Sequence, residues 1–268
     1  MRSSLRILAI PGLVFLLCHC LYAEPPATVV EKLREPTPGV EPLVLFLDSA
    51  EANQGSGDTR WVATSGTRLV TNGRDPWGNA FGAFGPPEDA AMGAAIAASI
   101  ESPLLSGDSG TLIFCVQVPE VTGDPAMIIS RGAWGDPVAF DLRADRTKIL
   151  RLYAGSNEPK PDSLQIGQYV PGTWLFIGLT WKKDGADLAL DTLVGEFGSG
   201  QSPMLNSFSI RQAGGKDSPV LIAGRTNRDL NSALLTGGLY CALAIYDVSF
   251  PQELIEGIFQ TMDSATVP

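Results

Sequence analysis

The feature that most constrains the fold of this chain is a long series of short apolar segments separated by Gly, Pro, Asp and Asn. This pattern is typical of β-strands joined by turns. The predicted strands are 43–48, 110–120, 126–132, 137–145, 148–155, two strands within 172–190 that meet at Asp184–Gly185, 218–225 and 238–247. The alanine-rich segment 92–100 is interpreted as a further, weak strand. An all-β sandwich or barrel follows from this order.

Several of these strands are apolar on both faces. In 111–118, Leu112 and its alternate neighbours share one face, while Ile113 and Cys115 share the other. The segment 174–181 has the same character. In 239–246, strict alternation puts Cys241 with Leu243 and opposite Tyr240. Strands of this kind lie in the middle of a packed structure rather than at a solvated edge.

The N-terminal segment 1–23 has the character of a secretory signal, with arginines followed by an apolar run from Ile7 to Leu21 and a small residue at Ala23. The run is shorter than the ~20 residues of a membrane-spanning helix. Two alternatives stay open: a lipoprotein acylated at Cys18 or Cys20, and an uncleaved anchor. We expect a secreted, periplasmic or cell-surface protein with no stable membrane span after cleavage.

The remaining chain is predicted to be one domain. The segment 24–41 is rich in Pro and Glu and is interpreted as a linker. The sandwich is expected over 42–260, and 261–268 as a tail. Within 249–259, Ser249 and Gln252 have capping-box spacing around Pro251, so a short helix is predicted to close the fold.

Charge and histidine content exclude several classes of function. The formal net charge is −10, and removal of 1–23 takes away two arginines and no acidic residue, which gives −12. An acidic chain without basic clusters repels phosphate backbones, so no nucleic-acid partner is expected. The single histidine, His19, lies in the predicted signal, which excludes histidine-based catalysis and imidazole ligands from the mature chain. A bound metal would be a hard cation held by oxygen atoms, above all calcium.

Two cysteines, Cys115 and Cys241, follow the predicted signal. An even number of cysteines in an oxidising compartment indicates one disulfide. The alternative is a pair of separate buried thiols that pack as small apolar side chains.

The order of several segments resembles the laminin-G-like branch of the concanavalin A-like jelly rolls. The resemblance covers about 42–260 and rests on SGTLIFCVQVPE, MIISRG, VPGTWLFIGLTW, PVLIAGR and GGLYCALAIYDVSFPQELIEGIF. It implies a two-sheet antiparallel β-sandwich with a short C-terminal helix, and an extracellular binding or adhesion role. Adhesive members often bind calcium through loop aspartates, but no such aspartate aligns here. Pentraxins share the fold and place the partner of the Cys115-equivalent cysteine where this chain has Gly178, so a bridge from Cys115 would have to reach Cys241.

Candidate ligand residues lie in predicted loops, where aromatic and polar side chains can meet at one rim. Trp134 and Asp136 belong to the first such loop. Arg225, Asn227 and Asp229 belong to the second. Trp77 is a further loop aromatic, whereas Trp174, Trp181 and Phe176 are expected in the core.

A hydrolase of this superfamily would need two carboxyl groups on one strand face, about 5–5.5 Å apart in a retaining enzyme. The sequence has no E-x-D-x-E run, and the pairs Asp187/Asp191 and Asp141/Asp145 are interpreted as turn and surface acids. No catalytic residues are therefore expected. We expect a non-catalytic module that binds a glycan or an extracellular protein. The alternatives are a structural or adhesion component of the cell envelope and, with less support, a glycoside hydrolase.

Overall fold

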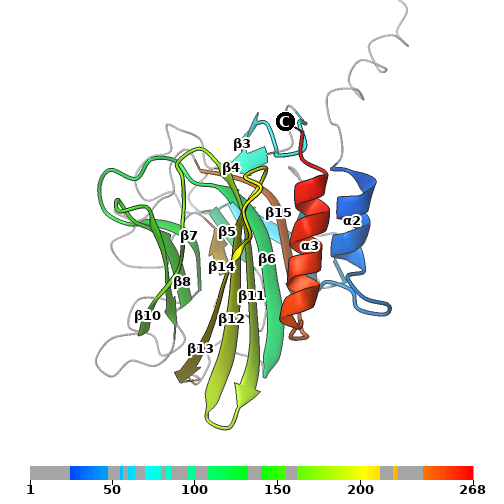
Figure 1. Cartoon of the computed structure of the whole chain (residues 1–268), viewed down its shortest axis with the longest axis vertical. Helices are drawn as coiled ribbons and strands as arrows, with labels where there is room; N and C mark the ends of the chain where they lie inside the picture. Colours follow the sequence, from blue (N-terminus) through cyan, green and yellow to red (C-terminus); the bar gives the residue numbers. More distant parts are fainter. Residues whose placement is uncertain are drawn as a thin grey trace, which may run out of the picture.

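The described part of the chain forms two antiparallel sheets and two helices (Figure 1). The computed structural model describes residues 25–47, 55–56, 60–63, 70–79, 83–85, 96–99, 108–131, 140–154, 162–211, 220–222 and 238–267. The helices and strands are α2 (Ala27–Arg34), β1 (Val44–Leu47), β2 (Arg60–Ala63), β3 (Val70–Gly73), β4 (Ala83–Gly85), β5 (Ile96–Ser99), β6 (Ser109–Gln117), β7 (Ala126–Arg131), β8 (Phe140–Ala144), β9 (Ile149–Ala154), β10 (Asp162–Gln168), β11 (Trp174–Asp184), β12 (Asp187–Glu196), β13 (Met204–Arg211), β14 (Val220–Ile222), β15 (Leu239–Tyr246) and α3 (Gln252–Ser264).

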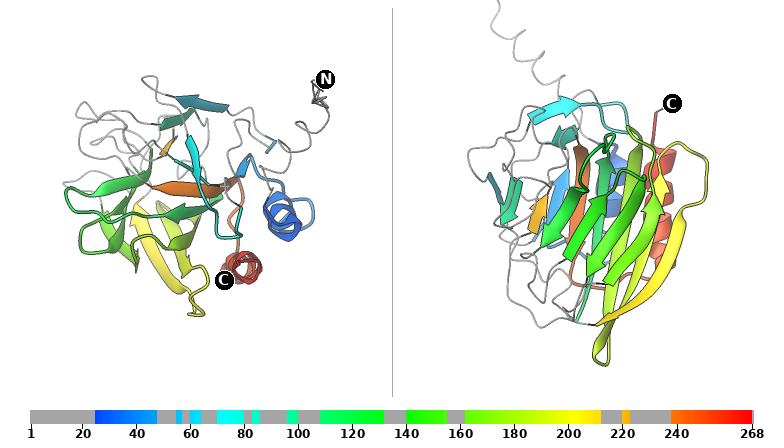
Figure 2. Two further views of the ribbon diagram at one scale, coloured as in Figure 1. Left: turned by 90° about the horizontal axis from the view of Figure 1, so that it is seen from above. Right: turned by 90° about the vertical axis from the view of Figure 1, so that its left-hand side faces the viewer.

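The sheets stack face to face as a β-sandwich of the jelly-roll type, which confirms the predicted fold class. The first sheet has eight strands in the order β13-β12-β11-β6-β15-β4-β3, with β1 also paired to β15. The second has seven strands in the order β10-β9-β8-β7-β14-β5-β2. Figure 2 shows the second sheet in front of the first, with the helices behind.

Two apolar cores lie on the two faces of the eight-stranded sheet. The inner core lies between the sheets and includes Phe114, Ile177 and Leu152. The outer core lies between this sheet and the helices, and includes Cys115, Phe176 and Phe259 together with residues of α2. Residues adjacent in one strand thus enter different cores, which explains why β6 and β11 are apolar on both faces, as predicted.

The predicted strands recur in the structure, and the weak strand of 92–100 is present as β5. Five strands in the described part of the chain were not predicted: β2, β3, β4, β10 and β13. Four of them, β2, β3, β10 and β13, lie at the outer ends of the two sheets; β10 consists largely of polar residues, and half of the residues of β13 are polar. Only Leu164 and Ile166 of β10 reach the inner core, so the sequence pattern of this strand is weak.

The segment 24–41 differs from the predicted linker. It contains α2, whose Val29 and Leu33 are fully buried in the outer core beside α3. The hydroxyl of Tyr246 donates a hydrogen bond of 2.6 Å to the carbonyl of Leu33. Figure 2 shows the two helices side by side on the same face of the sheet. The high Pro and Glu content of this segment led to the linker prediction, because the helix within it buries only two side chains.

The C-terminal helix is present but begins and ends differently from the prediction. α3 follows Pro251 and has no side-chain cap, because the Ser249 hydroxyl is hydrogen-bonded to Thr180 at 2.6 Å instead. The helix continues through the predicted tail to Ser264, and Met262 is fully buried. Its buried side chains form the i, i+3, i+4, i+7 stripe of an amphipathic helix: Ile255, Ile258, Phe259 and Met262.

The predicted disulfide is not formed in the structure. Cys115 and Cys241 are buried free thiols, and burial, together with the neighbouring Cys115 thiol, raises the pKa of Cys241. A β-bulge at Cys241 leaves Ala242 directly opposite Cys115. The bulge also reverses the predicted facing of the strand start, because Tyr240 enters the inner core and Cys241 the outer core.

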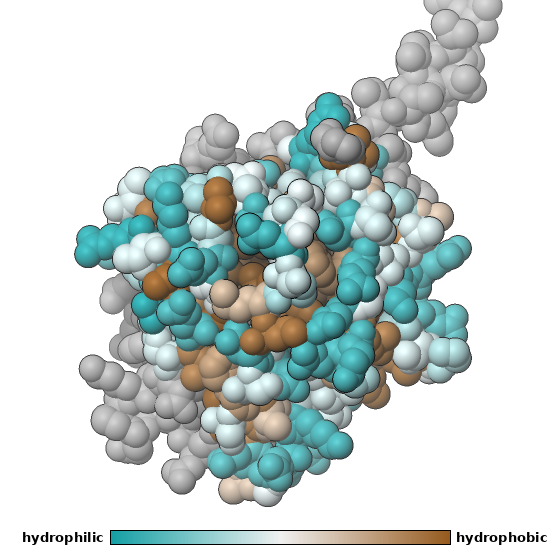
Figure 3. Space-filling model, in the orientation of Figure 1, coloured by the Kyte–Doolittle hydropathy of each residue, from teal (hydrophilic) through white to brown (hydrophobic). Residues whose placement is uncertain are grey.

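Among the described residues, no helix has the length and apolar character that crossing a membrane requires. Figure 3 shows a largely hydrophilic surface, with hydrophobic residues reaching it near the middle of the face in view.

Candidate functional site

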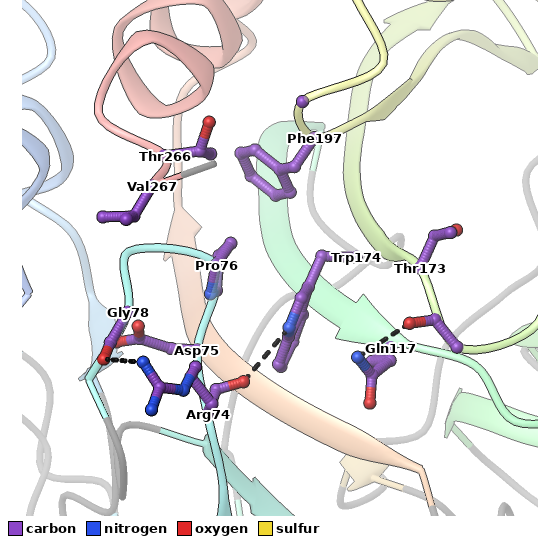
Figure 4. Close-up of a pocket in the computed structure, with 12 residues that line it drawn as sticks. Arg74, Asp75, Pro76, Gly78, Gln117, Thr173, Trp174, Phe197, Thr266 and Val267 are labelled. Atoms are coloured by element: carbon purple, nitrogen blue, oxygen red, sulfur yellow. Dashed lines mark hydrogen bonds between the residues drawn. The ribbon is translucent and has the colours of Figure 1, made fainter.

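A pocket of about 640 Å³ opens at one end of the eight-stranded sheet, beside the outer core (Figure 4). β6 ends there at Gln117, β11 begins there at Trp174, and the chain leaves β12 just before Phe197. Because neighbouring antiparallel strands run in opposite directions, these ends meet at one edge. The turn 74–79 after β3 and residues 266–267 after α3 complete the walls.

Aromatic side chains form the middle of the pocket. Trp174 is 8% exposed, and its indole N–H donates a hydrogen bond of 3.2 Å to the carbonyl of Arg74. Phe197 packs edge-on against Trp77, with ring centroids 6.4 Å apart, and is tilted against Phe259 at 5.9 Å. The pocket is therefore the open end of the outer core, where aromatic rings reach solvent.

Polar groups lie on both sides of the aromatic residues. On one side, the Arg74 guanidinium donates a hydrogen bond of 3.1 Å to the Gly78 carbonyl. On the other, the Gln117 side-chain amide donates one of 2.9 Å to the Gly172 carbonyl. Figure 4 shows Trp174 between these two groups.

Asp75 holds the turn 74–79 in shape. Its Oδ1 accepts hydrogen bonds from the backbone N–H groups of Trp77 (3.0 Å) and Asn79 (2.9 Å), and its Oδ2 accepts one of 2.7 Å from the Asn79 side chain. The residue is 3% exposed. Burial raises the pKa of this carboxyl, and the hydrogen bonds oppose that effect in part. Asp75 thus shapes the turn that presents Arg74 to the pocket.

The predicted site residues Trp134, Asp136, Arg225, Asn227 and Asp229 lie outside the described part of the chain, so they stay predictions.

The other tryptophans named in the sequence can be placed. Trp77 is 5% exposed, and its indole N–H donates to the Met262 carbonyl at 3.1 Å, so it is a core residue rather than a ligand platform. Trp174 is buried as predicted, yet it also lines the pocket. Trp181 is buried in the inner core.

Of the two acidic pairs considered for catalysis, Asp141/Asp145 is occupied in ion pairs. Asp141 is 2.6 Å from Arg143, and Asp145 is 3.0 Å from Arg151. No group of three or more His, Cys, Asp or Glu residues suited to a metal occurs in the described part of the chain.

No family model and no curated protein sequence matches this chain. Solved structures do resemble it. A botulinum neurotoxin serotype D/C binding domain aligns with a TM-score of 0.57 and 11% identity, over 82% of this chain and 52% of that one. The binding domain of botulinum neurotoxin DC in complex with SialylT aligns with a TM-score of 0.53 and 10% identity, over 82% and 51%.

A Trypanosoma rangeli sialidase in complex with 2,3-difluorosialic acid aligns with a TM-score of 0.51 and 14% identity, over 96% of this chain and 40% of that one. This chain spans about half the length of the toxin domains that it matches. It shares a β-sandwich fold with these proteins. At these identities the likeness concerns the fold alone.

Proposed function

We propose that this protein is a secreted, non-catalytic binding module of the laminin-G-like kind and that the pocket beside Trp174 holds a sugar residue of a glycan. The observation that carries the proposal is the arrangement of the pocket, in which aromatic rings lie between two hydrogen-bonding side chains. Sugars present apolar ring faces and polar edges, and a pocket of a few hundred Å³ with few oriented polar groups suits such a ligand.

A non-catalytic role agrees with the state of the acidic side chains. Asp75 is the only carboxylate among the described lining residues, and its oxygens already accept three hydrogen bonds. A glycosidase of the usual kind needs two carboxyl groups at the scissile bond. The similarity to toxin binding domains, one of them in complex with SialylT, supports the proposal at the level of the fold.

The test is binding of the purified protein to an array of neutral and acidic oligosaccharides. We expect Gln117→Ala to weaken glycan binding about tenfold, because one hydrogen bond to a ligand in a partly desolvated site is lost. We expect Phe197→Leu, which keeps an apolar side chain but removes the ring, to weaken it as well.

Matched controls lie away from the pocket. Gln260→Ala changes an exposed glutamine of α3, and Phe208→Leu changes a half-buried phenylalanine of β13. Both should bind as the unaltered protein does, and thermal melting checks that each variant is folded. Folded protein that binds no glycan would overturn the proposal and favour the structural or adhesion role. Equal binding by the pocket and control variants would overturn the assignment of the pocket.

A further inference from the structure

The pocket contrasts in charge with the rest of the chain. The chain carries a formal net charge of −10, yet among the described residues only Arg74 and Asp75 line the pocket with a charged side chain. Asp75 is buried and directs its oxygens to the backbone and side chain of its own turn. Asp263 is not among the described lining residues, and its Oδ1 accepts a hydrogen bond of 2.7 Å from the N–H of Gly198, which is one of them. The exposed charge in the pocket is therefore the Arg74 guanidinium.

Arg74 is held in place without a carboxylate partner among the described residues. The ion pairs found there join Arg143, Lys148, Arg151 and Lys183 to acidic side chains, and none involves Arg74. One nitrogen of the guanidinium donates to the Gly78 carbonyl, which anchors the group at the side of the pocket shown in Figure 4. Its other nitrogen donors stay free for a ligand, since a guanidinium has five N–H groups in a fixed plane.

We propose that the ligand of this pocket carries a carboxylate and that Arg74 pairs with it; the proposal rests on the glycan-binding function above and names its sugar class, an acidic sugar such as a hexuronate. A planar guanidinium matches a carboxylate with two parallel hydrogen bonds, and charge-assisted bonds of this kind are about twice as strong as neutral ones. The acidic sugar would lie with its carboxylate toward Arg74, and the adjacent sugar residue of the glycan would lie toward Gln117.

The test compares two probes with the same sugar backbone, namely trigalacturonate and its methyl ester, in which each carboxylate is replaced by a neutral ester, by isothermal titration calorimetry at fixed ionic strength. We expect the unaltered protein to bind trigalacturonate about tenfold or more tightly than the ester, as a lost hydrogen bond to a charged group implies. Arg74→Gln should remove this preference. Arg74→Lys should keep part of it, because the charge stays while the planar fork is lost.

The control is Arg146→Gln, which removes an exposed arginine in the turn between β8 and β9 and should keep the full preference. The Arg74 substitutions leave the backbone carbonyl that accepts from Trp174 in place. Equal affinity for both probes, or an unchanged preference in Arg74→Gln, would overturn the carboxylate inference. If a neutral glycan still binds and Gln117→Ala weakens that binding, the glycan-binding function is kept and only the carboxylate inference is lost. If no glycan on the array binds, both proposals fall.

Discussion

At the scale of single residues, Asp145 shows how an acid that resembles half of a catalytic pair can be structural. Its Oδ1 accepts hydrogen bonds from the backbone N–H groups of Thr147 (2.9 Å) and Ile149 (3.1 Å), and its Oδ2 accepts one of 3.0 Å from Arg151. These bonds shape the turn between β8 and β9, in which Lys148 adopts a left-handed φ of 63°. Burial alone would raise the pKa of Asp145, but the hydrogen bonds outweigh it and the pKa is lowered.

The first prediction concerns the pH dependence of stability. A carboxyl whose pKa is lower in the folded state stabilises the fold above its unfolded pKa of about 4, and this contribution is lost as the pH falls through the folded value. Asp145→Asn should therefore be less stable than the unaltered protein at pH 7, and the gap should narrow toward pH 3. Urea unfolding at both pH values measures this, with the exposed Asp124→Asn as control. A gap independent of pH would contradict the assignment.

A second residue-scale prediction concerns the close contact between α3 and the sheet. A Cβ added at Gly195 of β12 would lie 2.5 Å from ring atoms of Phe259, whereas one added at Gly257 of α3 would meet no atom within 4 Å. Gly195→Ala should therefore cost about 1–3 kcal/mol of unfolding free energy through overpacking. Gly257→Ala should raise that free energy by up to about 1 kcal/mol, because alanine favours helix. Denaturant titration measures both; equal effects would argue against this packing.

At the scale of elements, α2 is where composition and structure disagree most. Its sequence, ATVVEKLR, follows two prolines and precedes a further Pro- and Glu-rich stretch. Only Val29 and Leu33 are buried, too few for a clear apolar stripe. The helix is held by the outer core and by the hydrogen bond from Tyr246 to Leu33 rather than by its own propensity.

The third prediction tests this docking. Leu33→Ala should lower the free energy of unfolding by about 2–5 kcal/mol, the range for truncating a fully buried leucine. Thr28→Ala, an exposed change in the same helix, should have little effect. Thermal or denaturant unfolding of the two variants gives the comparison. If Leu33→Ala is as stable as the unaltered protein, the segment is a linker after all.

At the scale of the whole molecule, the two cores are joined through shared strands. β6, β11, β12 and β15 each supply side chains to both cores. A strand cannot leave one core without disturbing the other, so the sandwich and its helical layer form one cooperative unit.

The fourth prediction follows from this connection. Thermal unfolding should give one transition, with far-UV circular dichroism and tryptophan fluorescence changing together and with equal calorimetric and van't Hoff enthalpies. Trp181 reports on the inner core, while Trp77 and Trp174 report on the outer core. Two separate transitions, with Trp181→Phe and Trp174→Phe variants reporting different midpoints, would show that the layers unfold independently.

The sequence by itself determined the fold class and the central strands of this protein. The double-faced apolar pattern of β6 and β11 arises from burial on both sides, so it could be read without the structure. The edge strands β10 and β13 could not, because one face of each is solvated and at least half of the residues in each are polar. The bulge at Cys241 could not be predicted either, because the residues of 239–246 fit a regular alternating strand equally well.

The candidate site was decided by tertiary structure alone. Arg74, Gln117, Trp174, Phe197 and Val267 come from five separate parts of the chain and share no motif. Trp174 and its neighbours predict a buried strand, which is correct, but nothing local shows that the first residue of that strand borders a pocket. The pocket exists because antiparallel strand ends, a turn fixed by Asp75 and the end of α3 meet at one edge. Alternation along a strand records which side of the sheet a residue faces, whereas its place along the edge of the sheet depends on how the strands and helices pack.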